Sequence, residues 1–415
     1  MWKIVYNVLL HILLPFFLVY SLTNRKIRQN LVERLYPNTN NFANKGAIWI
    51  HAASVGEAVI AETVVNYIRK RFGFSNFVIT TNTYYTRDML RKKYNDTVSV
   101  HSLPFDLPFS LNQFIGKSTF KSLIIVETEL WPNLIWMAKK RSIPVIIING
   151  RISDKTYSTY QSFSFFLKHM LSDISLVLAQ SDLQAKRFKT LGMDSKKITN
   201  TGNIKYYREI EYKANRQREK MFITFGSIKE RELEVIFDVV DRLKRRFVGY
   251  VYVVAPREMN LVNVIESKLS ARFNTMRYSL YKRSDMESIK SVETIVVDTV
   301  GDLLDIYCKS LIAFVGGSLA PYGGQNILEP LFFETPVLFG PHVENFKDIA
   351  ETIMKDNAGK MVKDSEELFE NISLIVENHV LREEMGRQGQ KIIDAQKAVM
   401  ERTTDIIMGI SQKAL

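Results

Sequence analysis

The sequence contains almost no cysteine and shows no pattern of metal ligands. Cys308 is the only cysteine in 415 residues, so a disulfide within the chain is impossible and a cysteine-based zinc site is not expected. It lies in the apolar stretch from Leu303 to Ile312, as a small core residue would. The six histidines have no metal-ligand spacing, and no Asp-x-Asp sequence occurs. We therefore expect no bound metal, and a reducing environment for the body of the protein.

Repeats and low-complexity tracts are also absent, and acidic residues are outnumbered by basic ones. The hydrophobic content of 46% is ordinary for a globular protein, and the length predicts roughly two or three domains. An excess of 56 Lys and Arg over 44 Asp and Glu gives a formal charge of +12, which favours anionic partners. Because zinc fingers, RNA-binding aromatic motifs and arginine-rich tails are missing, an acidic membrane surface and a phosphorylated ligand fit better than nucleic acid.

Residues 4–22 form an apolar run, IVYNVLLHILLPFFLVYSL, with no formal charge. Its length is near the lower limit for crossing a hydrocarbon core of ~30 Å. Arg25, Lys26 and Arg28 follow, which predicts that the rest of the chain lies on the cytoplasmic side of an inner membrane. No small-residue cleavage pattern follows the run. Three interpretations stay open: a spanning anchor, a helix lying in or docked on the membrane surface, and a buried first helix of a soluble domain.

After residue 45, short apolar strands alternate with longer amphipathic segments. Near-continuous apolar runs indicate parallel strands that are buried on both faces. Alternation of this kind predicts α/β domains, each with a parallel sheet covered by helices. The expected strands are 47–53, 77–81, 122–127, 144–148 and 174–179 in the first half, and 221–225, 250–255, 294–297, 311–315 and 336–339 in the second.

The apolar pattern lapses between Lys205 and Lys220, where a domain boundary is expected. We expect the GT-B architecture, in which two Rossmann-like domains face each other across a cleft, preceded here by a hydrophobic helix. Open α/β sheets bind ligands at the carboxyl ends of their strands, so the cleft should collect strand-end loops. The predicted organisation is a membrane anchor or membrane-docking helix in 1–35, a first Rossmann-like domain in 36–204, a linker in 205–219, and a second Rossmann-like domain with charged C-terminal helices in 220–415.

Two motifs of the first half place acids directly after expected strands. HAASVGE, residues 51–57, turns from a strand into a helix and puts Glu57 in the first helical turn. Glu57 is either an acid that complements the helix dipole or a general base at the mouth of the cleft. The dipole should lower its pKa, and burial could offset this. In ETELWPNL, Glu127 and Glu129 end a buried strand and Pro132 suits the first turn of a helix, so we expect a functional site there.

Two further strand ends of this half carry basic residues. NGRIS, residues 149–153, places Arg151 where it could hold an anionic group or lie in solvent. TGNIK, residues 201–205, ends on Lys205, which we expect to face the cleft as a cation.

The second half has the features of a phosphate-binding site. The Gly-Ser pair at 226–227 follows a strand, and FVGGS leads through Gly317 and Ser318 into a glycine-rich loop and a helix expected to begin near Gln325. Backbone amides of such a loop can cradle phosphate oxygens, and Glu329 could take ribose hydroxyls. Without Asp-x-Asp, a metal-bridged nucleotide sugar is not expected, so cations and helix dipoles would stabilise the leaving phosphate.

Together these motifs resemble those of the bacterial Kdo (3-deoxy-D-manno-octulosonic acid) transferases. HAASVGE, ETELWPNL, NGRIS, TGNIK, PR, GGS…GGQNILEP and FGPHVENF occur in that family's order between residues 51 and 346, and the hydrophobic N-terminus matches too. The resemblance implies transfer of Kdo from CMP-Kdo to a lipid A precursor, lipid IVA, in lipopolysaccharide core biosynthesis, with inversion at the anomeric carbon. The first domain would bind the acceptor and the second the CMP-sugar, with no further cofactor.

The resemblance also implies roles for individual residues. Glu57 matches the family's catalytic base, and Glu127 and Lys205 match residues that stabilise the transition state. Together with the glycine-rich segments, the residues expected to bind CMP-Kdo are Gly226, Ser227, Pro256, Arg257, Val300, Gly301, Asp302, Gly317, Ser318, Asn326, Ile327, Leu328 and Glu329.

The sequence departs from the family pattern around the expected donor site. Glu258 follows Pro-Arg where His is common, Tyr322 and Gln325 replace Arg and His in the glycine-rich loop, and Lys229 and Arg231 stand in a stretch that usually holds His and Gly. These changes leave the reaction class intact and affect the phosphate and carboxylate contacts. Two alternatives stay open: a GT-B glycosyltransferase or epimerase that uses a UDP-sugar, and an inactive, membrane-tethered protein that binds a nucleotide sugar.

Overall fold

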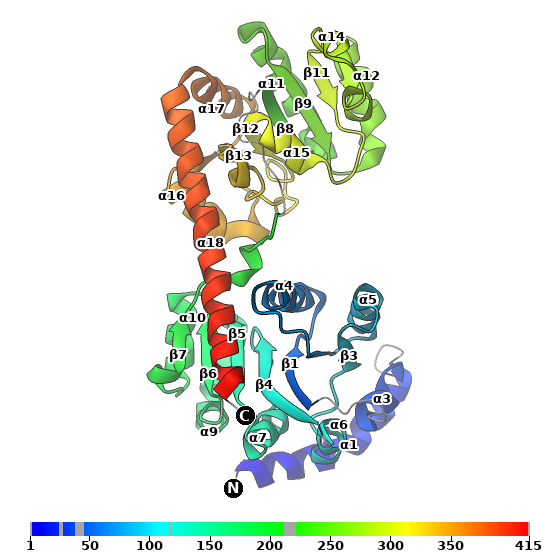
Figure 1. Ribbon diagram of the computed structural model, residues 1–415, viewed down its shortest axis with the longest axis vertical. Helices are drawn as coiled ribbons and strands as arrows, with labels where there is room; N and C mark the ends of the chain where they lie inside the picture. The colour runs from blue at the N-terminus through cyan, green and yellow to red at the C-terminus, as the bar shows by residue number, and fades with distance from the viewer. Residues whose placement is uncertain (1, 25–27, 38–44, 117, 211–220, 414–415) are drawn as a thin grey trace. The chain divides into compact units, whose positions relative to one another are not determined.

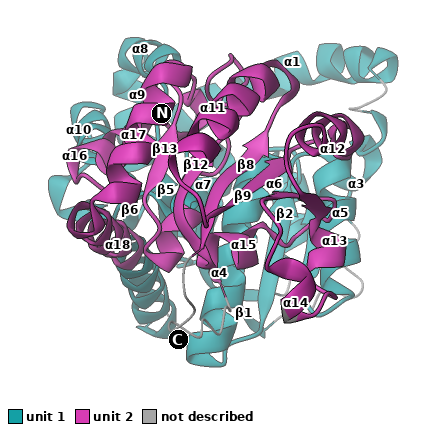
Figure 2. Cartoon of the chain, turned by 90° about the horizontal axis from the view of Figure 1, so that it is seen from above, with its two compact units in different colours: residues 1–208, 396–415 teal, residues 209–395 magenta. Residues whose placement is uncertain are grey.

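Strands and helices alternate along almost the whole chain and build two successive sheets (Figure 1). The computed structural model describes residues 2–24, 28–37, 45–116, 118–210 and 221–413. The chain divides into unit 1, residues 1–208 and 396–415, and unit 2, residues 209–395, which are coloured separately in Figure 2.

Unit 1 is built on a seven-stranded parallel sheet with the order β3-β2-β1-β4-β5-β6-β7. Apolar side chains project from both faces of β1: Trp49 joins one core cluster, and Ile48 and Ile50 join the other. This two-sided burial explains why the central strands are continuous apolar runs. Unit 1 contains α1 Trp2–Thr23, α3 Leu31–Leu35, β1 Lys45–His51, α4 Val55–Phe72, β2 Phe77–Thr81, α5 Tyr84–Tyr94, β3 Ser99–Ser102, α6 Pro108–Ile115, β4 Thr119–Val126, α7 Pro132–Lys140, β5 Val145–Gly150, α8 Asp154–Ser162, α9 Ser164–Leu171, β6 Leu176–Ala179, α10 Asp182–Thr190, β7 Ile198–Asn200, and the 3-10 helices η1 Ser195–Lys197 and η2 Ile204–Tyr206.

Unit 2 repeats this plan with the strand order β10-β11-β9-β8-β12-β13-β14, again all parallel. Its elements are β8 Phe222–Ile228, η3 Glu230–Glu232, α11 Leu233–Arg246, β9 Val251–Pro256, η4 Met259–Leu261, α12 Val262–Ser270, β10 Thr275–Arg277, α13 Tyr278–Tyr281, α14 Met286–Ile289, β11 Thr294–Val296, α15 Leu303–Cys308, β12 Ser310–Val315, η5 Pro330–Phe333, β13 Val337–Phe339, η6 Glu344–Phe346, α16 Lys347–Lys355, β14 Gly359–Met361, α17 Ser365–Glu377 and α18 His379–Lys413.

The predicted α/β class and parallel sheets are confirmed, and one predicted helix is wrong. No helix begins near Gln325. The segment from there to Glu329 is irregular, and only the 3-10 turn η5 follows. Pro330 opens that turn without a backbone donor, and Glu334 closes it in the left-handed region at φ 54°. The helices predicted from Ser365 to the end are present as α17 and α18.

The last part of α18, from Gln396 on, belongs to unit 1, whereas the sequence pattern predicted that it belongs to the second domain. Met400, Ile407 and Met408 are buried in the core cluster that covers one face of the first sheet. Contact is close at Gly202, where an added Cβ would lie 2.5 Å from Val399 Cγ2. The expected boundary at residue 204 also lies too early, since Tyr207 packs in the same cluster. Most of the predicted linker lies outside the described residues.

Helix α1 is part of unit 1 and is not a separate N-terminal element. It lies beside α6 and α7 in Figure 1. The Tyr6 hydroxyl donates to Asp106 Oδ2 at 2.9 Å, and the side-chain amides of Asn7 and Asn133 are hydrogen-bonded to each other. These polar contacts fix one face of a helix that is otherwise apolar.

Candidate active site

The strand order of unit 1 reverses between β1 and β4, and this reversal creates a place for a ligand. From β1 the chain builds outward through β2 and β3 on one side, and from β4 through β5 to β7 on the other. Loops that leave the carboxyl ends of two such neighbouring strands run in opposite directions and leave a crevice. The segment after β1 carries Glu57, and the segment after β4 carries Glu127 and Glu129. All three carboxylates predicted from the motifs therefore belong to this switch point.

Glu57 lies in the first turn of α4, where Ser54 is the N-cap. Its Oε2 accepts the amide of Ala53 at 2.8 Å and its Oε1 accepts the Ser54 hydroxyl at 2.9 Å, while its own amide donates to Ser54 Oγ at 3.3 Å. This is a variant of the capping box, so Glu57 does have the helix-start role that the sequence left open. The same side chain is only 9% exposed.

Burial raises the pKa of Glu57 to about 7, although the hydrogen bonds from Ala53 and Ser54 act in the opposite direction. The negative charges of Glu129 and Glu127 raise it further. A carboxylate that titrates near neutral pH can accept a proton effectively, whereas an ordinary exposed one is a weak base. Burial, which the sequence left open as an opposing effect, is thus the largest influence on this pKa.

Glu127 is held in an unusual backbone conformation at the end of β4. Its φ is 58°, in the left-handed region that non-glycine residues rarely adopt, and its amide donates to Ile148 O at 2.9 Å. Glu129 accepts from Trp131 Nε1 at 3.1 Å and from Asn82 Nδ2 at 3.4 Å, and burial raises its pKa. Backbone strain of the kind seen at Glu127 is often found at functional sites, and the roles predicted for Glu127 and Glu129 stay predictions.

Lys205 lies in η2, and its turn is tied to the neighbouring strand end. The amide of Ile204 donates to Asn149 Oδ1 at 3.0 Å, at the carboxyl end of β5. The amide of Lys205 donates to Asn203 Oδ1 at 3.0 Å, and the lysine side chain is exposed. Arg151, beyond the same strand, is exposed as well, and its amide bonds to Thr128 between the two acids. The structure thus places the basic residues Lys205 and Arg151 along the same edge of the sheet as the three acids.

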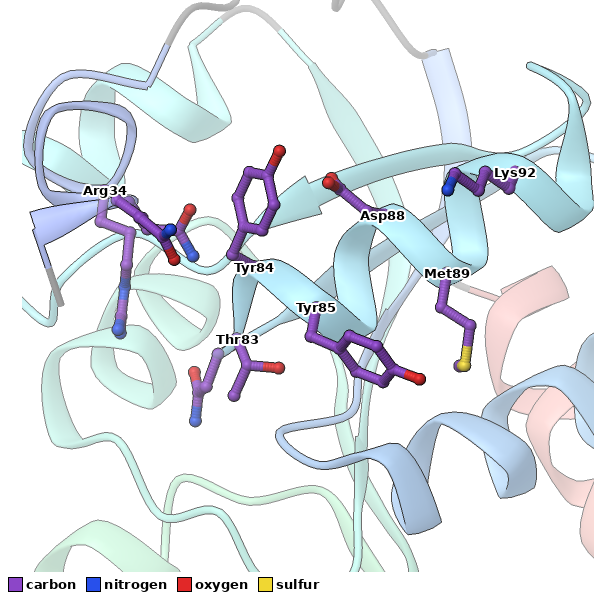
Figure 3. A pocket seen from close by; sticks show the side chains of 10 residues that line it. Arg34, Thr83, Tyr84, Tyr85, Asp88, Met89 and Lys92 are labelled. Carbon is purple, nitrogen blue, oxygen red and sulfur yellow. The ribbon is translucent and has the colours of Figure 1, made fainter. Parts of the chain in front are cut away.

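A pocket of about 860 Å³ opens beside this edge (Figure 3). Asn82, which donates to Glu129, lines it. Arg34 of α3 lies on its rim, and the start of α5 contributes two tyrosines, of which Tyr85 is 70% exposed. The residues that line it are Gln29, Asn30, Arg34, Asn82, Thr83, Tyr84, Tyr85, Asp88, Met89 and Lys92. Exposed aromatic rings with nearby cations suit a phosphorylated sugar. No motif in the sequence pointed to this pocket.

The switch point of unit 2 lies between β8 and β12, and the predicted glycine-rich segments meet there. Gly226 and Ser227 form the end of β8, and an added Cβ at Gly226 would lie 2.1 Å from the Tyr307 hydroxyl. Ser227 has φ 57°. Gly317 and Ser318 follow β12 directly. The two segments are thus brought together, although Gly226 and Ser227 lie within the strand and not between a strand and a helix.

The amides of the glycine-rich loop are already used by a carboxylate. Glu232 is 1% exposed. Its two oxygens accept the amides of Gly317 at 2.7 Å, Ser318 at 2.9 Å and Leu319 at 2.9 Å, and also that of Lys229 at 3.0 Å. These amides therefore do not form the phosphate cradle expected from the sequence. Sequence reasoning missed the bonds of Glu232 to the glycine-rich loop because those three partners are 85 or more residues away; only its bond to the Lys229 amide is local.

Positive side chains surround the same loop and offer another way to bind an anion. Lys229 Nζ lies 4.8 Å from the Tyr322 ring centre and Arg231 Cζ lies 5.9 Å from it. Three of the positions where the sequence departs from the Kdo transferase pattern, Lys229, Arg231 and Tyr322, thus lie close together. Lys229 is also paired with Glu258 at 2.8 Å, while Arg257 is exposed after β9.

The other residues expected to bind the donor lie along the same edge of unit 2. Pro256 ends β9, and the amide of Arg257 bonds to Ile228 O at 2.8 Å. Asn326 donates to Glu329 at 3.1 Å. Three further positions lie between β11 and α15, where a salt bridge joins Asp302 to Lys282, Gly301 has φ 94° and Val300 is 85% exposed. Ile327 and Leu328 are buried in the core, so only their backbone could reach a ligand.

The two parallel seven-stranded sheets, each with a candidate site at its strand ends, show the GT-B architecture. The crystal structure of UDP-GlcNAc 2-epimerase from Neisseria meningitidis bound to UDP-GlcNAc is similar, with a TM-score of 0.56 at 13% identity over 89% of this chain and all of that one.

Within that architecture the chain belongs to the 3-deoxy-D-manno-octulosonic acid (Kdo) transferase family. A 3-deoxy-D-manno-octulosonic acid transferase of Haemophilus influenzae is 31% identical over 424 residues, covering 98% of both chains. The family profile for these transferases matches residues 28–208. A bifunctional glycosyltransferase/methyltransferase of Fusobacterium nucleatum is 35% identical over 388 residues, which are 89% of this chain but only 58% of that protein.

Proposed function

We propose that this protein transfers Kdo from CMP-Kdo to a lipid A precursor such as lipid IVA, with inversion at the anomeric carbon, in lipopolysaccharide core biosynthesis. The observation that carries the proposal is Glu57. It is a buried carboxylate with a pKa raised to about 7, at the switch point of the unit that also holds Glu127 and Lys205. Membership of the Kdo transferase family supports Kdo as the sugar that is transferred and CMP-Kdo as its donor in this proposal.

In the proposed reaction, Glu57 takes the proton from a primary hydroxyl of the acceptor. The hydroxyl oxygen attacks the anomeric carbon of Kdo as the bond from that carbon to the CMP phosphate breaks, and CMP leaves with the electron pair. One displacement from the face opposite the leaving group inverts the configuration. Lys205 would stabilise the negative charge that develops, and Glu127 the positive character at the sugar. A positioned base contributes about 10²–10⁴-fold and a positioned charge a comparable amount.

We propose that cations bind the two anionic groups of the donor, its phosphate and the Kdo carboxylate. Arg257 is exposed after β9, and Lys229 and Arg231 lie beside the ring of Tyr322, where a ligand anion would compete with Glu258 for Lys229. Within the described ranges, no group of three His, Cys, Asp or Glu side chains could hold a metal ion. We propose a metal-independent reaction: activity should persist in excess EDTA, and a loss that Mg²⁺ restores would show that a metal is required.

The pocket beside Glu129 is the proposed site for the sugar of the acceptor. Tyr84 and Tyr85 can stack on sugar rings, and the exposed Lys92 can pair with a phosphate group, whereas the Arg34 guanidinium already donates to Leu103 O at 2.7 Å. Tyr85→Ala should raise the KM for lipid IVA without changing the binding of CMP-Kdo. The control is Leu280→Ala at an exposed position of unit 2, which should leave the KM for lipid IVA unchanged.

The direct test is to incubate the purified protein with CMP-Kdo and lipid IVA and weigh the lipid by mass spectrometry. An increase by one or more Kdo residues is expected, and the increment also gives the number transferred. A second arm compares thermal shifts with CMP and UDP. Stabilisation by UDP alone would favour the alternative of a UDP-sugar enzyme. Selective stabilisation by CMP without product would favour the alternative of an inactive protein that binds a nucleotide sugar.

A further inference from the structure

The N-terminal helix α1 contacts the rest of unit 1 along its whole length. The partly or fully buried positions recur every three or four residues, as on one face of a helix: 2, 6, 7, 10, 14, 17, 18, 21 and 24. Near its start, the Trp2 ring lies 4.9 Å from Phe165. Near its end, the Phe17 ring lies 5.2 Å from Phe105. These anchor points are 15 residues apart, or about 22 Å along the axis.

The polar contacts of α1 are buried and specific. Asp106 is 7% exposed, and its carboxylate accepts the Tyr6 hydroxyl together with the amides of Asn133 and Leu134 at the start of α7. Asn7 and Asn133 bond to each other through their side chains. If α1 crossed a bilayer, Asp106 and Asn133, which are hydrogen-bonded to it, would have to lie in the hydrocarbon core, which is ~30 Å thick. A carboxylate and helix termini of a water-soluble sheet domain cannot be placed there at reasonable cost.

The opposite face of α1 is apolar and exposed. Ile4 is 69% exposed, Phe16 70% and Val19 67%. Phe165, whose ring lies beside Trp2, is 53% exposed as well, and Val32 of α3 is 71% exposed. An exposed apolar surface of this extent marks an interaction site.

The charges at the edges of this surface fit an anionic bilayer. Lys3 precedes the apolar run and Arg28 follows it, with no Asp or Glu between them, while Asp173 of unit 1 is paired with Lys3 at 3.9 Å. Lys140 adds a further exposed cation four residues after Trp136, on the side of α7 that contacts Tyr6. Basic residues around an apolar helix face are the pattern of helices that lie in the membrane interface.

We infer that α1 lies flat in the interface of an anionic bilayer, with its exposed face in the lipid and its other face on unit 1, and does not cross the membrane. Both ends of α1 are then on the same side of the membrane as the sheets. The inference does not depend on the proposed reaction. If that reaction is correct, the flat orientation also puts α3 and its Arg34, on the rim of the pocket, next to the lipid that carries the acceptor.

Labelling of single cysteines tests the orientation. In a Cys308→Ala background, Lys3→Cys and Thr23→Cys place a thiol near either end of α1, at exposed positions. A membrane-impermeant maleimide should label both in inverted inner-membrane vesicles and neither in intact spheroplasts. Val248→Cys in unit 2, 83% exposed, is the control for the cytoplasmic side. If either end of α1 is labelled in spheroplasts while Val248→Cys is not, the helix crosses the membrane and the inference is overturned.

Vesicle flotation tests the lipid contact. The full-length protein should float with phosphatidylglycerol and phosphatidylethanolamine vesicles. The Leu13→Asp, Phe16→Asp double variant should bind about a hundredfold more weakly or worse, because burial of each apolar side chain contributes about tenfold or more. Val264→Asp with Leu280→Asp, on exposed positions of unit 2, is the matched control and should float normally. Undiminished flotation of the α1 variant with an unchanged circular dichroism spectrum would show that lipid does not contact this face.

Discussion

The two sheets of this protein have the same strand plan, but the buried carboxylates at their switch points, Glu57 and Glu232, differ in the number of hydrogen bonds that they accept. In unit 1, Glu57 accepts two hydrogen bonds from its own helix start, is partly desolvated and has a pKa raised to about 7. In unit 2, Glu232 accepts four backbone amides and is almost fully buried. The number of donors separates the two roles. A carboxylate with many fixed donors holds a loop in place, whereas one with few donors and like-charged neighbours can take a proton.

The largest effect is expected from Glu57→Gln. The amide keeps the shape and the bond from Ala53 but cannot take a proton, so kcat should fall by about 10²–10⁴-fold. Binding of CMP, measured by calorimetry, should stay the same. The melting temperature serves as the control for the helix cap. Near-normal turnover at saturating substrates would mean that Glu57 only begins α4, and Glu127 and Glu129 would become the candidates for the base.

Lys205→Ala removes a cation from the same edge of unit 1. If Lys205 acts on developing negative charge, kcat should fall by about 10²–10³-fold, the range for loss of one such group, 2.7–4 kcal/mol. Lys197→Ala is a suitable control, since its Nζ bonds only to the backbone of Ser172 and Ile174 among the described contacts. An equal loss in both variants would point to general charge and not to a role of Lys205.

Glu232→Gln tests the other half of the comparison. Replacing the carboxylate leaves at least two buried amides without a charged acceptor, which should lower the free energy of unfolding by on the order of 3 kcal/mol. Denaturant melts of the variant and of Glu230→Gln, on an exposed neighbour, would measure this. Stability should change in the first and not in the second. A variant of wild-type stability that has lost CMP binding would instead make Glu232 a ligand-binding residue.

The smallest effect is a shift in the pH dependence. As the pH falls through about 7, Glu57 gains a proton and kcat should decline. Glu129→Gln removes a negative charge that favours protonated Glu57, so the pKa of Glu57 should fall and the decline should move to lower pH. Asp88→Asn is a neutralising control in the pocket and should leave the profile in place. An unmoved profile in Glu129→Gln would assign the titration to another group.

Much of the fold can be read from the sequence because its central strands are buried on both faces. The run at 77–81 became β2 with the same bounds, and Pro132 begins α7 as predicted. The short edge strands escaped notice, since β3 reads SVHS and β7 reads ITN, with no apolar run. The absent helix at Gln325 shows that a glycine-rich loop after a strand does not by itself announce a helix.

The site was predictable where a motif fixes a residue to a strand end, and not where distant segments meet. The positions of Glu57 and Glu127 followed from the alternation of strands and helices. The net direction of the Glu57 pKa did not, because desolvation depends on tertiary packing. The bonds of Glu232 to the glycine-rich loop and the contacts of Lys229 with Tyr322 join different segments of the chain. No pattern within either segment reveals its partner.

The path of the chain has a consequence for how the protein is made. The chain leaves unit 1 at residue 208 and returns to it only within α18, near residue 396. Met400 and Ile407, which fill the core beside the first sheet, are therefore synthesised only after the whole of unit 2. Unit 2, a continuous stretch, can complete its core while unit 1 still waits for its final helix. The half of the protein that is synthesised first is thus the half that finishes folding last.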